Sequence, residues 1–405
     1  MQATIGATSG PAEPPGGAAR AGVYSAGMLR NAVREGILRG AHAIGHGQIQ
    51  PASLDLRIGA RGFRLRSSFL PGDARVRERL TDLQVGPEID LAQPGGMVLD
   101  PRIPYLIQLD ERLKLPRGVS ARANPRSSTG RLDIFTRVLT DRGSQFDEIR
   151  DGYEGPLWLE LYSNTFTVNL RAGLCLAQLR LTTAREPLSP GEIAAEHERE
   201  PLLFAPGTGS RQPRQPIAQP RIGSRGLLLS VSLPSGGYQV GWRARHHAPL
   251  LDLSVTGAYD PLQYWEPVEA ESGGRLVLDP DYFYLLISRE YVRIPPSLAA
   301  EMAAYDPTNG ELRTHYAGFF DPGFGYGPDL RGTRAVLEVR AHDIPFLLED
   351  GQPIARLAFE RMAQEPEQLY GGTDSGSHFQ HQGISLSRQF RPVSGAITFR
   401  VLGTE

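Results

Sequence analysis

An internal repeat divides the chain into two similar parts. The segment Met97-Val-Leu-Asp-Pro101 recurs as Leu276-Val-Leu-Asp-Pro280. Further matches follow in the same order: Tyr105-Leu106 with Tyr284-Leu285, Lys114-Leu-Pro116 with Arg293-Ile-Pro295, Leu159-Glu160-Leu161 with Leu337-Glu338-Val339, and residues 172–179 with 350–357. A repeat of this length indicates that one folding unit occurs twice, so we expect two similar domains in tandem. The 405 residues also exceed the size of one ordinary hydrophobic core.

Both parts show the hydrophobic period of β-strands. Apolar and polar residues alternate in short runs at 53–58, 63–66 and 159–161. Because Gly, Pro and Asp separate such runs, the pattern predicts an all-β-dominated fold, a sandwich or barrel with few short helices. One helix is predicted after the N-cap residue Ser25, with an apolar face from Met28 to Leu38 and its end at Gly40.

Composition sets the expected domain boundaries. Residues 1–20 are mostly Ala, Gly and Pro, which predicts a disordered tail. Residues 187–225 are rich in Pro, Arg, Gln and Gly, and we expect a linker there with one short helical piece at 192–200. The two domains are then expected at 21–186 and 226–405.

Charge and cysteine content exclude several classes of protein. A net charge of −2 provides no broad basic field for nucleic acid. Cys175 is the only cysteine, which excludes an intrachain disulfide and a zinc site built on paired cysteines. Histidines and carboxylates show no metal-binding spacing, so no metal site is predicted. Without an apolar run of membrane-spanning length or a signal peptide, we expect a soluble cytoplasmic protein.

One polar loop has the composition of a phosphate site. Asn124–Leu132 reads Asn-Pro-Arg-Ser-Ser-Thr-Gly-Arg-Leu, with two serines between Arg126 and Arg131. Hydroxyls, turn N–H groups and guanidinium groups suit a polyphosphate, and Gly130 lets the backbone approach a ligand closely. Similar turns are common on solvated surfaces, and the pattern alone leaves both interpretations open.

Two strands carry a glutamate between apolar residues. Glu160 and Glu338 stand at equivalent positions of the repeat, each at the centre of such a triplet. A carboxylate there either faces a pocket or points outward in simple alternation, and the pattern favours neither.

Taken together, the motifs resemble those of dCTP deaminases. The matching segments are 49–59, 126–131, 152–155, 159–161 and 173–179 in the first copy, and 317–323 and 370–388 in the second. The resemblance implies two tandem domains with the distorted β-barrel or jelly-roll fold of trimeric dUTPases. It also implies active sites between subunits, and so a homo-oligomer with a trimer-like ring.

The activity that this resemblance implies is hydrolytic deamination of dCTP to dUTP and ammonia, feeding pyrimidine deoxynucleotide synthesis. A zinc deaminase requires a His-x-Glu and Pro-Cys-x-x-Cys set, which one cysteine cannot supply. A glutamate, Glu160 or Glu338, would then activate water as general base. Mg²⁺ would be bound through the substrate triphosphate, with no zinc.

The resemblance also assigns roles in the first copy. Ser127 and Arg131 would orient the water and hold the pyrimidine or the adjacent phosphate, and Arg126 and Ser128 would bind the triphosphate. Two residues of the first motif, Asp55 and Arg57, would contact substrate or form a salt bridge that braces the phosphate loop; both roles are equally expected.

In the second copy the resemblance assigns a substrate hairpin and a lid. The hairpin, with Gly318, Phe320 and Asp321, would read the sugar and base, although Asp-Pro-Gly is also an ordinary turn. The lid, about 370–390 with Gln380 and Gln382, would close over the phosphates unless it is a frayed terminus.

Each copy lacks part of this set. The first has no Ala-Gly…Asp-Pro-Gly hairpin, and residues 306–311 of the second replace the Ser-Ser…Arg loop with an acidic segment. We therefore expect a composite site, with the loop from the first copy and the hairpin, Glu338 and lid from the second. In the alternative, the first copy uses its own Glu160 in an ordinary threefold arrangement.

Two other functions remain open. A dUTP pyrophosphatase, or an enzyme that converts dCTP to dUMP, would use the hairpin Asp321 as base. A non-catalytic nucleotide-binding regulator would retain the pocket without turnover.

Overall fold

A computed structural model describes residues 20–183, 186–207, 214–304, 312–314, 318–327, 330–372, 380, 383–393 and 400–401. The predicted tail (except Arg20), the acidic loop 306–311 and Gln382 lie outside these residues. Below, the N-terminal half ends at residue 183 and the C-terminal half begins at residue 186.

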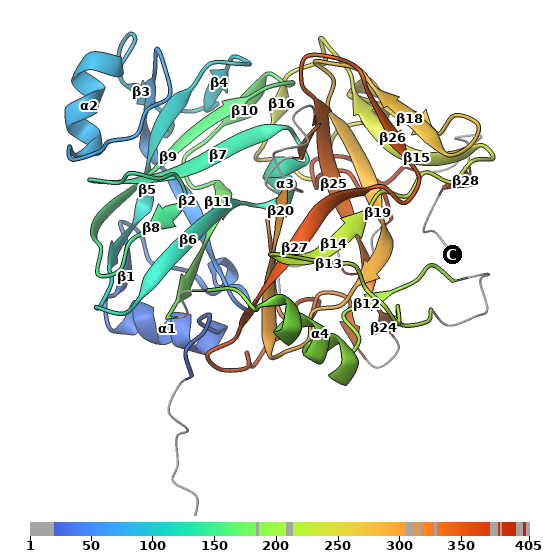
Figure 1. Cartoon of the computed structure of the whole chain (residues 1–405). Coiled ribbons are helices and arrows are strands. Elements are labelled where there is room, and N and C mark those ends of the chain that lie inside the picture. The colour runs from blue at the N-terminus through green and yellow to red at the C-terminus, as the bar shows by residue number, and fades with distance from the viewer. Residues whose placement is uncertain are drawn as a thin grey trace, which may run out of the picture.

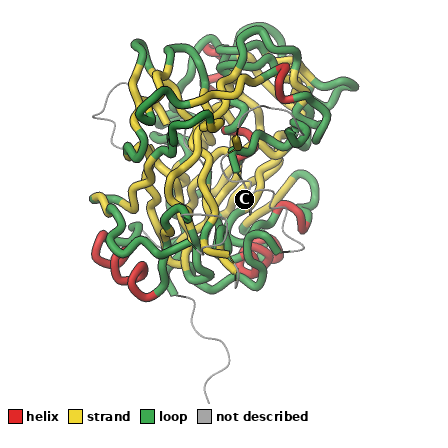
Figure 2. The backbone as a smooth tube through the Cα atoms, turned by 90° about the vertical axis from the view of Figure 1, so that its right-hand side faces the viewer, coloured by secondary structure: helices red, strands yellow, loops and turns green. Residues whose placement is uncertain are grey.

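Two β-rich halves lie side by side, confirming the predicted all-β-dominated, barrel-like fold (Figure 1). Strands run through the middle of the molecule, and the longer helices lie at its margins (Figure 2). The helices are α1 (Ala26–Arg34), η1 (His46–Gln48), α2 (Val76–Leu83), α3 (Ser127–Gly130), α4 (Pro190–Arg199) and η2 (Pro261–Gln263).

The N-terminal half contains a nine-stranded sheet with the path β7-β9-β5-β2-β11-β6-β8, joined by β1 and β3. Its strands, with β4 and β10 of a second sheet, are β1 (Leu38–Gly40), β2 (Leu54–Arg64), β3 (Ile89–Asp90), β4 (Met97–Leu99), β5 (Tyr105–Lys114), β6 (Ser120–Pro125), β7 (Ile134–Thr140), β8 (Glu148–Ile149), β9 (Glu154–Ser163), β10 (Val168–Leu170) and β11 (Cys175–Thr182).

The C-terminal half is built around a seven-stranded and a five-stranded sheet. Its strands are β12 (Leu203–Phe204), β13 (Ile222–Gly223), β14 (Gly226–Ser230), β15 (Tyr238–Ala244), β16 (Leu251–Asp252), β17 (Trp265–Glu269), β18 (Arg275–Leu278), β19 (Tyr284–Val292), β20 (Leu298–Ala304), β21 (Leu312–Thr314), β22 (Phe319–Phe320), β23 (Tyr326–Gly327), β24 (Leu330–Arg331), β25 (Thr333–Ala341), β26 (Phe346–Glu349), β27 (Pro353–Arg361) and β28 (Arg400–Val401).

The first helix is shorter than the sequence predicts. Ser25 is its N-cap, as expected, but α1 ends at Arg34. Gly36 then takes a positive φ of 72°, and Leu38 begins β1, which pairs with β5. The apolar period continues past the helix because Leu38 is buried as a strand residue instead.

The expected linker region contains ordered elements. Helix α4 starts at a Ser189 N-cap and buries Ile193. Strand β12 pairs with β19, and Glu196 of α4 accepts a 2.7 Å hydrogen bond from Arg361. This part of the chain is therefore attached to the C-terminal half.

Strand register is repeated between the halves. Leu106 pairs with Glu160 on β5 and β9, and Leu285 pairs with Glu338 on β19 and β25. The two glutamates therefore occupy equivalent places in the two sheets.

The same register aligns the two hairpins. Ala121 pairs with Ile149 in one half, and Ala300 pairs with Phe320 in the other. The residue after each hairpin strand is Arg150 in the N-terminal half and Asp321 in the C-terminal half. Only the C-terminal hairpin thus carries a carboxylate at this position.

One face of the C-terminal half is buried against the N-terminal half. Trp242, Leu285 and Val336 belong to the same hydrophobic core as many residues of the N-terminal barrel. Strand β16 extends this contact, because it pairs in parallel with β10 of the other half. The two halves are consequently packed through a continuous apolar core.

The corresponding face of the N-terminal half is covered by its own chain. Its register-equivalent residues Phe63, Leu106 and Trp158 pack with Val76 and Leu80 of α2. Arg77 of α2 donates a 3.1 Å hydrogen bond to Gln108 on the same face and lies over the Trp158 ring. We call residues 65–83 the α2 cover.

Candidate active site

The predicted phosphate loop forms one helical turn, α3, directly after β6. The Arg126 N–H donates to the Leu176 carbonyl, and the Gly130 N–H donates back to the Arg126 carbonyl. Arg131 follows the turn and is only 3% exposed. The loop is therefore a buried turn and not a solvated surface loop.

Glu338 of the C-terminal half lies against this loop. A Cβ on Gly130 would approach its Oε1 to 2.6 Å, so a larger residue there would displace the carboxylate from this position. The side chain is buried, and its Oε2 has no hydrogen-bond partner within the described structure. Such an oxygen can accept a hydrogen bond from a bound water or ligand.

The surroundings of Glu338 raise its affinity for a proton. Burial raises its pKa to about 8, Arg131 opposes this shift, and Asp133 adds to it. Burial also lowers the pKa of Arg131 to about 10, so this guanidinium stays charged at neutral pH. The loop guanidinium and the strand carboxyl thus lie close to each other across the two halves.

Glu160 has different neighbours. Ser68 of the α2 cover donates a 2.8 Å hydrogen bond to its Oε1, and Arg137 lies 3.8 Å from the same oxygen. Burial raises the pKa of this carboxyl, and the Ser68 hydrogen bond and Arg137 oppose the shift. Glu160 is therefore held by the α2 cover and by Arg137 of its own half, although its Oε2, like that of Glu338, has no hydrogen-bond partner within the described residues.

The hairpin of the C-terminal half also faces the N-terminal half. Gly318 lies where a Cβ would be 2.8 Å from the Pro125 carbonyl. Asp321 accepts a 3.0 Å hydrogen bond from Arg180 of β11 and a 3.4 Å hydrogen bond from Ser53. Phe320 packs edge-on against Phe324, within its own half. The Asp321 carboxylate is thus held in a buried ion pair between the halves.

The two residues of the first motif point to different partners. Asp55 lies 3.2 Å from Arg126 of the loop, and burial raises its pKa to about 6 against the opposing charges of Arg126 and Arg388. Arg57 instead contacts Glu111 at 3.4 Å and the carbonyls of residues 42 and 43. Asp55 therefore belongs to the loop site. Arg57 holds strand β5 and residues 42–43 of its own half in place.

The described part of the predicted lid lies over the loop. Arg131 donates a 2.8 Å hydrogen bond to the Ser385 carbonyl, and the Ser387 hydroxyl donates a 2.6 Å hydrogen bond to the Ser128 carbonyl. Gln380 is directed to its own half, where it donates to the Gly323 carbonyl at 2.9 Å. The segment 383–390 thus connects the loop with the C-terminal half.

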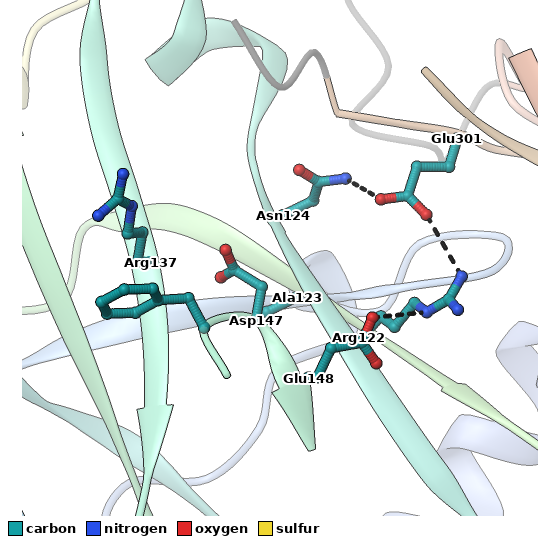
Figure 3. Close-up of a pocket in the computed structure, with 8 residues that line it drawn as sticks. Arg122, Ala123, Asn124, Arg137, Asp147, Glu148 and Glu301 are labelled. Atoms are coloured by element: carbon teal, nitrogen blue, oxygen red, sulfur yellow. Dashed lines mark hydrogen bonds and ion pairs between the residues drawn. The ribbon is translucent and has the colours of Figure 1, made fainter. Parts of the chain in front are cut away.

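A cavity of about 330 Å³ lies between β6, the β7–β8 hairpin and β20 (Figure 3). In it Arg122 bridges Glu148, at 3.1 Å, and Glu301, at 3.7 Å. Asn124 donates a 2.8 Å hydrogen bond to Glu301. Because its opposite charges already neutralise one another, this cavity has no clear excess of cationic groups for a polyphosphate.

Sequence reasoning missed three charged residues of the contact between the halves: Asp133, Arg180 and Arg340. Their partners lie in the other half of the chain, so no local spacing marks them. The position of Asp133 two residues after Arg131, and of Arg340 two residues after Glu338, was the available signal.

Neither a metal centre nor a membrane span is found in the described part of the chain. No group of three or more His, Cys, Asp or Glu residues there could hold a metal ion. No helix among these residues is long and apolar enough to cross a membrane.

Family models match both halves of the chain. The N-terminal domain model of 2'-deoxycytidine 5'-triphosphate deaminase matches residues 20–185, and the C-terminal domain model matches residues 206–390. A relative from Persephonella marina, named dCTP deaminase, dUMP-forming, is 31% identical over 35% of this chain and 72% of its own length. A dCTP deaminase from Natronomonas pharaonis is 30% identical over 35% of this chain and 69% of its own length.

A solved structure extends the similarity to both halves together. The crystal structure of 2'-deoxycytidine 5'-triphosphate deaminase from Agrobacterium tumefaciens is 43% identical in sequence and superimposes with a TM-score of 0.79. The match covers 88% of this chain and 99% of that chain. The chain described here therefore belongs to the dCTP deaminase family.

Proposed function

We propose that the protein deaminates dCTP to dUTP and ammonia at one composite site between its halves, with Glu338 as general base. The observation that carries the proposal is the contact of the Glu338 carboxylate with Gly130 of the Ser127–Arg131 loop. A carboxylate oxygen that has no hydrogen-bond partner among the described residues, close to hydroxyl and guanidinium groups, can take a proton from water without the help of a zinc ion.

In the proposed reaction a water molecule adds to C4 of the cytosine ring. Glu338 takes the water proton as the C–O bond forms, and later gives a proton to the amino group, which leaves as ammonia. Arg131 and Ser127 would hold the water and the ring in line with the carboxylate. The desolvated surroundings strengthen these interactions and keep bulk water out.

The triphosphate would lie along the other side of the loop. Arg126, Ser128 and Arg388 supply the guanidinium and hydroxyl groups, and Asp55 holds Arg126 in place. Mg²⁺ would enter with the substrate phosphates, which is the usual way that this ion binds nucleotides. The homo-oligomeric state and cytoplasmic location stay predictions.

Product analysis tests the proposal directly. Purified protein is incubated with dCTP and Mg²⁺, and nucleotides are resolved by anion-exchange chromatography alongside an ammonia assay. A dUTP peak with an equal amount of ammonia is expected. Binding of dCTP without any product would instead identify a nucleotide-binding regulator.

Conversion to dUMP is the second candidate, because the relative from Persephonella marina is named dUMP-forming. That reaction needs a base near the α-phosphate, and Asp321 is the sequence candidate. Its ion pair with Arg180 and its hydrogen bond from Ser53 favour a structural role in this conformation. A dUMP and pyrophosphate peak in the same chromatogram would establish this second reaction.

Glu160→Gln is expected to leave kcat for dCTP close to the wild-type value, because Glu160 is bound by Ser68 of the α2 cover and Glu338 is the carboxylate at the loop. The same change should lower the free energy of unfolding by about 1–3 kcal/mol, since it disturbs a buried hydrogen-bonded carboxylate. Steady-state kinetics and chemical denaturation measure the two effects. Loss of activity with Glu160→Gln alone would contradict the composite site.

The pH dependence of kcat/KM should report the state of Glu338 in the free enzyme. A general base works only when deprotonated, so a carboxyl pKa raised to about 8 makes kcat/KM rise with pH up to that region. We expect the midpoint of the acidic limb of this profile to lie at a pH well above the ordinary pKa of glutamate. A profile that is flat between pH 5 and 8 would contradict this assignment.

A further inference from the structure

An ion pair lies next to the Glu338 contact. Arg340 of β25 donates to both carboxylate oxygens of Asp133, with Nε 3.2 Å from Oδ1 and Nη2 close to Oδ2. Thr165 donates a 2.6 Å hydrogen bond to Asp133 and accepts a 2.8 Å hydrogen bond from Arg340. Asp133 is fully buried, so this bidentate pair is desolvated and geometrically well defined.

The position of the pair follows from the two chain segments. Side chains two residues apart on a strand share a face, so Arg340 and Glu338 both face the N-terminal half. Asp133 stands two residues after Arg131, at the end of the loop. The charges therefore alternate across the contact, with Arg131 beside Glu338 and Arg340 beside Asp133.

The N-terminal half lacks the same arrangement around Glu160. The residue two positions after Glu160 is Tyr162, whose ring stacks on Phe135 at 4.9 Å. The ion pair with Asp133 is therefore specific to the strand that carries Glu338.

We propose that Arg340 and Asp133 are positioning residues for the deamination: their ion pair fixes the Glu338 carboxylate against Gly130 and neutralises the one carboxylate beside it. This role rests on the proposed function. The other charged group that faces Glu338 is Arg131, with Tyr370 of the C-terminal segment next to that guanidinium. Neither residue of the pair needs to touch substrate.

Two single substitutions separate this role from a purely structural one. Asp133→Asn is well suited because Asp133 has a φ of 58°, a conformation that asparagine tolerates. Arg340→Gln removes the cation and leaves Asp133 in place. Each change breaks the ion pair, and a displacement of Glu338 of about 1 Å is expected to lower kcat by about 100-fold.

The decisive readout is the acidic limb of the pH–rate profile. Removing the Asp133 charge takes a carboxylate away from Glu338, so Asp133→Asn should move the limb to lower pH. Arg340→Gln leaves that carboxylate unneutralised, so it should move the limb to higher pH. Arg340→Lys keeps the charge but loses the bidentate geometry. We expect the acidic limb to lie at nearly the same pH as in the wild type, while kcat is reduced.

Arg289→Gln is the matched control, because Arg289 forms a half-exposed ion pair with Asp350 in the same half. It should change neither kcat nor the limb. Shifts in the same direction for Asp133→Asn and Arg340→Gln, or an unchanged kcat, would overturn the positioning role while wild-type turnover upheld the proposed function. Absence of deamination by the wild-type protein would overturn both.

Discussion

Glu338→Gln is expected to lower kcat for dCTP deamination by about 1000-fold or more. Glutamine keeps the size of the side chain but can neither take the proton of water nor return one to the leaving ammonia. General base catalysis contributes typically about 100-fold to 10,000-fold, and this carboxylate would serve in two proton transfers. Rapid-quench or long-time assays with dCTP measure the residual rate.

Binding distinguishes a lost base from a lost fold in this experiment. The Glu338→Gln protein should retain dCTP affinity, because the side chains proposed to bind the substrate phosphates, Arg126, Ser128 and Arg388, are unaltered. Its stability should rise or stay the same, since a buried carboxyl with a raised pKa becomes a neutral amide. Glu160→Gln is the matched variant at the equivalent strand position. Wild-type activity in Glu338→Gln would rule out Glu338 as the base.

Gly130→Ala is expected to lower kcat by about 100-fold with little loss of fold. The added Cβ would lie 2.6 Å from Oε1 of Glu338, and contacts under 3.0 Å force one partner to move. Because Gly130 is part of a helical turn held by backbone hydrogen bonds, the carboxylate is the group that shifts. A displaced base loses the alignment that the reaction requires.

Gly191→Ala provides the control for this substitution. Gly191 lies in helix α4, where an added Cβ would meet no atom within 4 Å and the backbone has no positive φ. Kinetics and thermal unfolding of both variants separate a local steric effect from a general cost of adding a methyl group. Equal kcat values for Gly130→Ala and the wild type would show that Glu338 does not work in the observed position.

The sequence was sufficient to predict the fold class and to select the residues that meet at the loop. The alternation of apolar and polar residues within a short strand is a local feature of the sequence, so it can be recognised without knowledge of the tertiary contacts. The complementary losses in the two copies also pointed to a contact between the Ser127–Arg131 loop and Glu338, which the structure places together.

Other features required the three-dimensional structure. Pattern alone could not choose between Glu160 and Glu338, because the α2 cover, which lies against Glu160, has an ordinary amphipathic sequence. Arg340 and Asp133 are 207 positions apart, and nothing local in either segment indicates the other. The direction of Arg57 is likewise decided by Glu111, a residue on a neighbouring strand.

The α2 cover has a consequence for how molecules of this protein can associate. A head-to-tail contact between like domains can repeat until it closes into a ring, or continue as an open filament, because each added domain presents a fresh face to the next one. Here the face that would continue the series is buried under Val76 and Leu80. The N-terminal half therefore cannot offer this face to a further domain while the α2 cover is in place.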